Sequence, residues 1–367
     1  MLAGAGRLRL ITTLGAAKTR LGELARWFEV HAVKGSVPIA LVALAGSWSR
    51  DEVTFHFPTN QLLSDCDVVV VVSSRSVVTS SILCRLITHK LNRELAPQFS
   101  DLGVSISAMD ASTKQWSLAT PEMYELLHHP RIILGDSNKL PCVRLAARDI
   151  PMWEGVRLVC NRSIELLCAL LPSLDIQSSM RSPQGQNALA KLLISLSDAR
   201  MLQMSCYKST LRAKESWFLE ETSTTPELRS LFRWAVKFKL NSVADQSRIP
   251  RVMDLELAYS EAIRTIETCT GGGVDELPRW LANTYKRSDF AMGVNRGILG
   301  VSGHPAPRLY VASLHVLRHL LGGDPSELSK ASRAMRVVAS PNLDALAMTQ
   351  RIAARYSKSP QLVSLKS

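Results

Sequence analysis

Two stretches decide how this chain folds: AGSWSRDE at residues 45–52 and LSDCDVVV at residues 63–70. The first follows an aliphatic run at residues 37–45, and the second opens an unbroken run of valines. Short apolar runs that are rich in β-branched residues and bounded by polar turns are typical of buried strands. We therefore predict two core strands, at residues 37–45 and 66–73, joined by a polar connection.

Helical periodicity flanks these strands. Apolar residues recur three and four apart at residues 9–32 and again at residues 77–95, which predicts a helix in each segment. Residues 103–109 alternate between polar and apolar and predict a third strand. Strands separated by helices indicate an α/β domain, and we expect a small mixed sheet flanked by helices.

After Pro121 the pattern becomes helical almost throughout. Periodicity predicts helices at residues 122–128, 154–171, 187–207, 226–239, 255–268, 278–285, 308–321, 325–338 and 342–356. A chain of 367 residues exceeds the usual length of one domain. We predict an α/β domain at residues 1–150 and a mainly α-helical domain at residues 151–367.

Four residues in the two motif stretches can form a binding site. Gly46 and Ser47 offer backbone N–H groups and a hydroxyl at a predicted helix start, where a triphosphate is favoured. Asp65 and Asp67 stand two apart at the start of a strand, so their side chains leave the same face. Their repulsion is relieved by a divalent cation, and oxygen-only ligation suits Mg²⁺ or Mn²⁺. We predict a nucleotide and metal site at these residues.

A Gly-Ser pair followed by an acidic-x-acidic pair that opens a hydrophobic strand resembles the DNA polymerase β-like nucleotidyltransferase superfamily. The stretch GSWSRDE at residues 46–52 is similar to that of the minimal nucleotidyltransferases, and the resemblance covers about residues 35–135. It implies that the Gly-Ser pair grips the triphosphate, whereas the two aspartates bind metal and are catalytic. The helical part is similar to the bundles that accompany these enzymes.

The resemblance also implies roles outside the four motif residues. Arg50 is expected to contact the nucleotide phosphates, although Arg50 and Glu52 would equally fit a solvated helix turn. In the helical part, Asp198, Lys191 and Arg162 are candidates for an acid or base, with surface ion pairs as the alternative for residues on amphipathic helices.

The resemblance implies a magnesium-dependent nucleotidyltransferase. Such an enzyme moves a nucleoside monophosphate from a nucleoside triphosphate, here expected to be ATP, to a hydroxyl acceptor by two-metal in-line displacement. A small molecule, a protein side chain and an RNA end all remain open as acceptors.

The third strand raises an alternative. Enzymes of this superfamily carry a third carboxylate there, and alternation puts Ser105 at its place, with Asp101 before the strand and Asp110 after it. The alternative is a catalytically weak or inactive nucleotide-binding protein with a regulatory or interaction role. The side chain that faces the two aspartates discriminates between these hypotheses.

Composition and charge indicate which partners and which cellular compartment to expect. The net charge of +12 favours anionic partners, but no RNA-binding motif with paired aromatic residues is present. The longest apolar runs are far shorter than the roughly 20 residues of a membrane span, so we expect no membrane partner. The seven cysteines lack the spacing of a zinc site or a disulfide framework, and we predict a cytoplasmic protein.

Overall fold

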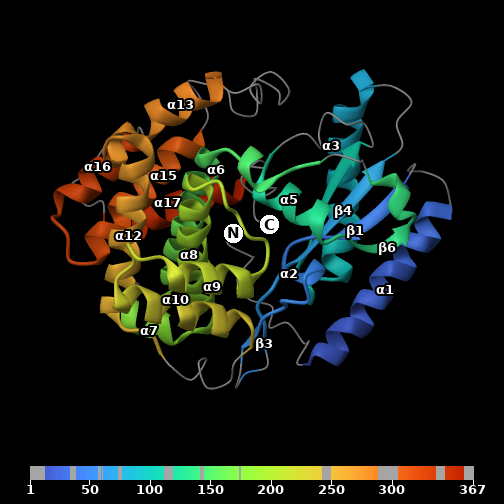
Figure 1. Ribbon diagram of the computed structural model, residues 1–367, viewed down its shortest axis with the longest axis horizontal. Helices are drawn as coiled ribbons and strands as arrows, with labels where there is room; N and C mark the ends of the chain where they lie inside the picture. Colours follow the sequence, from blue (N-terminus) through green and yellow to red (C-terminus); the bar gives the residue numbers. More distant parts are fainter. Residues whose placement is uncertain are drawn as a thin grey trace. The chain divides into compact units, whose positions relative to one another are not determined.

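The computed structural model divides the chain into two compact units (Figure 1). It describes residues 13–33, 39–56, 59, 61–72, 77–110, 119–140, 144–172, 175–241, 249–287, 305–335 and 344–358. The first unit contains Met1–Ala146 and Lys239–Gln246, and the second contains Ala147–Phe238 and Ser247–Lys366. The first unit is mixed α/β and the second is helical, in agreement with the predicted order of fold classes. Whether the two regions are independent domains stays a prediction.

The first unit is built on a four-stranded mixed sheet and its helices. The strands of the sheet are β1 (Ile39–Leu44), β4 (Cys66–Val72), β5 (Val104–Asp110) and β6 (Arg131–Gly135). A separate hairpin is formed by β2 (Phe55–His56) and β3 (Gln61–Leu62). The helices of this unit are α1 (Leu14–Val33), α2 (Gly46–Ser49), α3 (Val77–Gln98), α5 (Pro121–His128) and the 3₁₀ turn η1 (Ser137–Lys139). The three strands predicted from the valine and alternating patterns are confirmed. The hairpin was not predicted, because two-residue strands are too short to show a period.

The strands follow the order β5-β4-β1-β6. β1 runs antiparallel to both β4 and β6, whereas β4 and β5 are parallel and are joined through α3. A parallel pair requires a crossover connection, which a helix commonly provides. This topology puts β4 in the interior of the sheet and β5 at its edge.

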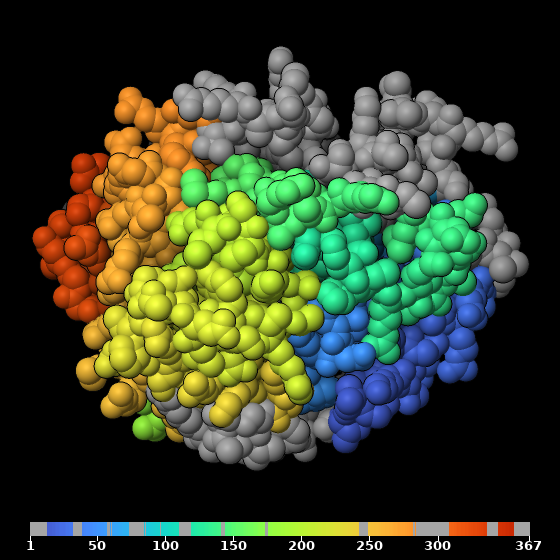
Figure 2. Space-filling view, viewed as in Figure 1, coloured from blue at the N-terminus to red at the C-terminus, as the bar shows by residue number. Residues whose placement is uncertain are grey.

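The valine run of β4 is buried on both faces of the sheet. Val68, Val70 and Val72 belong to the core under α1 and α3, whereas Val69 and Val71 belong to a second core under α5. Figure 1 shows α1 and α5 on opposite sides of the sheet, and Figure 2 shows α1 in dark blue at the surface of this unit. Burial on both faces explains why the sequence of β4 is apolar without alternation.

Side chains of α3 satisfy the edge strand β5. The Asn92 amide donates to Ile106 O at 2.8 Å and accepts from Ile106 N at 3.0 Å. Ala108 N donates to Thr88 Oγ1 at 2.9 Å. Asn92 therefore replaces a neighbouring strand at Ile106, which blunts an edge that could pair with another chain.

Replacing Asn92 with leucine is expected to lower the free energy of unfolding by about 1–3 kcal/mol, because it removes the partner of both Ile106 backbone groups. The urea midpoint measures the effect. Arg93→Ala, which alters an exposed neighbour on the same helix, is the control. Equal midpoints for the two variants would contradict the role of Asn92.

The second unit consists of helices throughout its described residues. They are η2 (Ala147–Asp149), α6 (Met152–Leu170), α7 (Ile176–Arg181), α8 (Pro183–Gln203), α9 (Leu211–Glu220), α10 (Pro226–Lys239, whose last residue belongs to the first unit), α12 (Val252–Thr270), η3 (Val274–Glu276), α13 (Leu277–Arg287), α15 (Pro305–Leu320), α16 (Ser326–Ala334) and α17 (Ala345–Lys358). The predicted helices are confirmed where they fall on described residues. The short helices α7 and α9 were not predicted. Among the described residues no helix has the length and apolarity that a bilayer span requires.

Helices α6 and α8 approach closely at Gly155. A Cβ atom on Gly155 would lie 2.6 Å from Ala199 Cα, which is closer than atoms in contact can approach. Gly155 therefore sets the distance between the two helices.

The same substitution is expected to have opposite effects at two helical glycines. Gly155→Ala should destabilise the protein by about 1–3 kcal/mol, because α6 and α8 must move apart. Gly22→Ala, in an exposed position of α1 with open space around it, should stabilise it by about 0.5–1 kcal/mol through helix propensity. Thermal unfolding of both variants measures the difference, and a shift in the same direction would refute this account of the α6–α8 contact.

Candidate functional site

The turn after β1 brings Gly46 next to Asp67. Gly46 has a φ of +59°, in the left-handed region that favours glycine, and it begins α2. A Cβ atom at this position would lie 3.1 Å from Asp67 Oδ2, and Ala45 N donates to Asp67 O at 2.9 Å. Two of the predicted site residues, one from each motif stretch, are therefore in close proximity.

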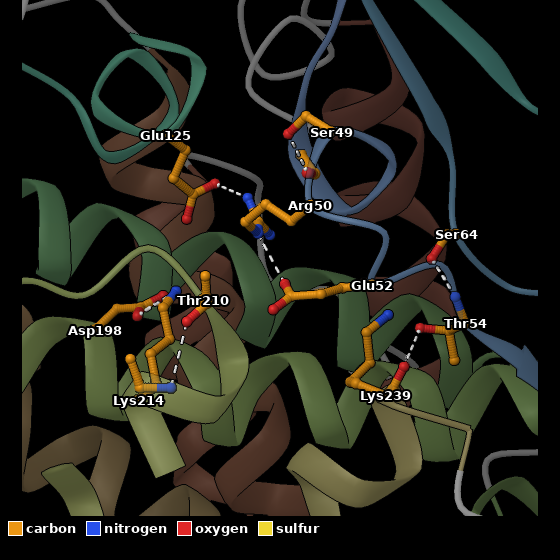
Figure 3. Close-up of polar contacts among 12 residues, drawn as sticks. Ser49, Arg50, Glu52, Thr54, Ser64, Glu125, Asp198, Thr210, Lys214 and Lys239 are labelled. Atoms are coloured by element: carbon orange, nitrogen blue, oxygen red, sulfur yellow. Dashed lines mark hydrogen bonds and ion pairs between the residues drawn. The ribbon is translucent and has the colours of Figure 1, made fainter. Parts of the chain in front are cut away.

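Helix α2 is a single turn of four residues, Gly46–Ser49. The Ser49 hydroxyl donates to Gly46 O at 2.8 Å (Figure 3). Glu52 N donates to Ser47 O at 2.9 Å. A macrodipole grows with the number of aligned peptides, so a single turn contributes little. Any attraction for an anion at Gly46 and Ser47 must come from individual backbone N–H groups and the Ser47 hydroxyl.

The two aspartates occupy the start of β4. Asp65 precedes the strand by one residue and Asp67 is its second residue, and both side chains are half-buried. Cys66 between them is fully buried in the core under α1 and α3. Because side chains alternate along a strand, Asp67 points to the opposite face, on the side of α5.

Ser105 is the residue of β5 that stands beside Asp67. The parallel register pairs Asp67 with Ser105, and both are half-buried. This is the position where the family resemblance leads one to expect a third carboxylate. Among the described residues no group of three histidine, cysteine or acidic side chains could hold a metal ion.

The two other acids around β5 lie elsewhere. Asp101 accepts from Arg20 of α1, with Nε–Oδ2 and Nη2–Oδ1 distances of 2.7 Å and 3.0 Å. Asp110 is paired with Val72 at the far end of β4, and the rise of a strand separates it from Asp67 by about 16 Å. The Asp101 carboxylate is thus directed to Arg20, and the backbone of Asp110 stands at the opposite end of the strand pair from Asp67.

The ion pair with Arg20 perturbs the ionisation of Asp101. Partial burial disfavours the charged carboxylate, but the hydrogen bonds and positive charge of Arg20 outweigh it and hold the pKa of Asp101 below its usual range. The ion pair between Arg20 and Asp101 joins α1 to the turn before β5.

Asp101→Asn is expected to lower the free energy of unfolding by about 1–2 kcal/mol at pH 7, because it breaks this partly exposed pair. The pKa of Asp101 is lower in the folded than in the unfolded state, where it is about 3.9. The ion pair therefore stabilises the protein fully above the unfolded pKa, and this stabilisation is lost as the pH falls through the folded pKa. The difference between wild type and variant should thus shrink between pH 5 and pH 3 in urea titrations. A difference that is constant over that range would exclude an electrostatic origin.

Arg50 lies between two carboxylates. Its Nε donates to Glu52 Oε2 at 2.8 Å and its Nη1 donates to Glu125 Oε2 of α5 at 2.5 Å (Figure 3). The side chains of Arg50, Glu52 and Glu125 are 10%, 8% and 11% exposed, so this is not a solvated turn. Removing one partner of a buried ion pair commonly costs about 3–5 kcal/mol. Two of the three guanidinium nitrogens of Arg50 are thus directed to carboxylates, and its predicted contact with phosphate stays a prediction.

Arg131 of β6 holds the other side of the same turn. Its Nη1 donates to Trp48 O at 3.2 Å and to Asp51 Oδ1 at 2.5 Å. Asp51 has a φ of +56°, which is unusual for a residue other than glycine. The sequence analysis missed Arg131, because no spacing rule connects residues 80 positions apart in the chain.

Asn241 makes hydrogen bonds to the chain segment at Val53 and Phe55, which lies between the two motif stretches in the sequence. Its amide donates to Val53 O at 2.6 Å and accepts from Phe55 N at 2.5 Å. Between them, Thr54 N donates to Ser64 Oγ at 2.9 Å, as Figure 3 shows. The first unit therefore includes hydrogen-bond partners from far along the chain, which no local pattern could have revealed.

The candidates in the helical part all make ion pairs within the second unit. Arg162 and Lys191 both contact Glu165, at 2.5 Å and 3.4 Å. Asp198 pairs with Lys214 at 2.8 Å, and both side chains are buried (Figure 3). These contacts fit the structural alternative, and a role as acid or base stays a prediction.

No family model, curated protein or solved structure matches the chain. The family resemblance therefore depends on the motif residues alone.

Proposed function

We propose that the first unit binds a nucleoside triphosphate together with one divalent cation, with ATP and Mg²⁺ as the expected pair. Gly46 and Ser47 would hold the triphosphate, and Asp65 and Asp67 would hold the cation. Transfer of the nucleoside monophosphate would be weak or absent, so that the protein has a nucleotide-dependent regulatory or interaction role. The observation that carries this proposal is the pairing of Asp67 with Ser105.

The residues present fit a single cation. A Cβ atom on Gly46 would lie 3.1 Å from Asp67 Oδ2, so a phosphate held at Gly46 and a cation held by Asp67 would be neighbours. Two carboxylates supply the hard oxygen ligands that magnesium prefers, and magnesium usually completes its shell with water and phosphate oxygens. The bound cation would neutralise charge on the triphosphate.

Transfer of the nucleoside monophosphate would require a further cation ligand in addition to the two aspartates. Two-metal displacement needs a second cation to lower the pKa of the attacking hydroxyl, and the family resemblance assigns that cation to a third carboxylate. Ser105 offers a neutral hydroxyl instead, and Asp101 is engaged with Arg20. A full transferase would need an acid from another part of the chain.

Binding and transfer can be tested together by calorimetry with ATP, GTP, CTP and UTP in magnesium and by pyrophosphate release. The wild type should bind in a metal-dependent way, and Asp67→Asn should bind at least about tenfold more weakly, because a cation ligand loses its charge. Pyrophosphate release with water, an aminoglycoside or an RNA oligonucleotide as acceptor should stay at background.

Ser105→Asp is the matched gain-of-function variant, since it restores the third carboxylate. It should raise pyrophosphate release above the wild-type rate, whereas Ser107→Asp, one position further along the same face of β5, should not. Rapid release by the wild type would favour the transferase, and no nucleotide binding by the wild type would refute the site.

A further inference from the structure

The Gly46–Ser49 turn is followed directly by Arg50, which joins it to α5. The guanidinium uses two different nitrogens for two carboxylates: Nε for Glu52, on the same loop, and Nη1 for Glu125, on the helix. We infer that Arg50 is a positioning residue, which holds the phosphate-binding turn against α5 and does not itself contact the phosphates. This inference rests on the proposed nucleotide site.

The direction of the contacts supports positioning. A planar guanidinium that donates along two edges is fixed in orientation as well as in place. Moving the guanidinium out of this arrangement toward a triphosphate would break both ion pairs and leave the carboxylates of Glu52 and Glu125 unneutralised near an incoming anion. Repulsion between these carboxylates and the anion opposes such a movement.

The turn is also held at its other side. Arg131 of β6 donates to Trp48 O and to Asp51 Oδ1, and the residues just before and after the tight part of the turn, Gly46 and Asp51, both have left-handed backbones. Such conformations persist when surrounding contacts determine them. Arg50 links the turn to α5, and Arg131 links it to β6. The backbone groups of the turn are therefore arranged before nucleotide arrives, which reduces the entropy lost on binding.

The two roles of Arg50 predict opposite effects of Glu125→Gln. If Arg50 bound phosphate, weakening its pair with Glu125 would release it toward the ligand, and nucleotide binding would be unchanged or tighter. If Arg50 positions the turn, the same change loosens the turn from α5 and nucleotide binding becomes weaker, although no positive charge has been removed.

The experiment measures the dissociation constant of magnesium-ATP by calorimetry, and the unfolding midpoint, for wild type, Glu125→Gln, Arg50→Lys and the double variant. We expect each single variant to bind about tenfold more weakly and the double variant to bind little worse than either, because both changes break one connection. Lysine keeps the charge but cannot span both carboxylates.

Glu122→Gln is the matched control, since it removes the same charge from the first turn of the same helix, whereas the ion pair with Arg50 is made by Glu125. It should bind ATP as well as the wild type. If Arg50→Lys does not fold, the sign of the change in Glu125→Gln decides the question by itself.

Three results would overturn the inference. Glu125→Gln could bind ATP as tightly as the wild type or more tightly while Arg50→Lys binds it weakly, which would make Arg50 a phosphate ligand. Both variants could bind as the wild type does, which would remove any role of Arg50 in binding. Finally, a wild type without magnesium-dependent nucleotide binding would refute the proposed function, and the inference with it.

Discussion

The antiparallel pairing of β1 with β4 is the constraint on which the site depends. It places the end of one strand beside the start of the other, so that Ala45 hydrogen-bonds to Asp67 and Gly46 lies against the Asp67 carboxylate. The two motif stretches, which a polar connection and a hairpin separate along the chain, therefore lie side by side. Without this pairing, neither the glycine turn nor the acidic pair would be a site.

The register of that pairing is protected by burial. β4 presents valines to a core on each face, and Cys66 fills one of these cores while Asp67 emerges on the other face. A slip by one residue would bury the carboxylate and expose the thiol, so the hydrophobic effect opposes it strongly. The face on which Asp67 emerges is thus set by the buried apolar side chains of the two cores.

The sequence analysis predicted the parts that have a local signature. The valine strand and the longer helices of the second unit follow from periodicity, because each depends on residues near in the chain. The place of Ser105 was expected from the alternation of its strand together with the family resemblance. The contacts of Arg50 with Glu125, of Arg131 with Asp51 and of Asn241 with Val53 were not predicted. They join residues that are 75, 80 and 188 positions apart, and such pairings are determined by tertiary packing alone. For this reason the sequence indicated the candidate site residues but not the contacts that support them.

The assignment of Lys239–Gln246 to the first unit has a consequence for synthesis. The ribosome completes every strand of the sheet by Gly135, yet Val53 and Phe55 receive their side-chain partner only when Asn241 has emerged. Chains usually fold unit by unit from the N-terminus as they are made. Here the hydrogen bonds of Asn241 with Val53 and Phe55 form only after about a hundred further residues have been translated, and a nascent chain that is released before that point lacks them.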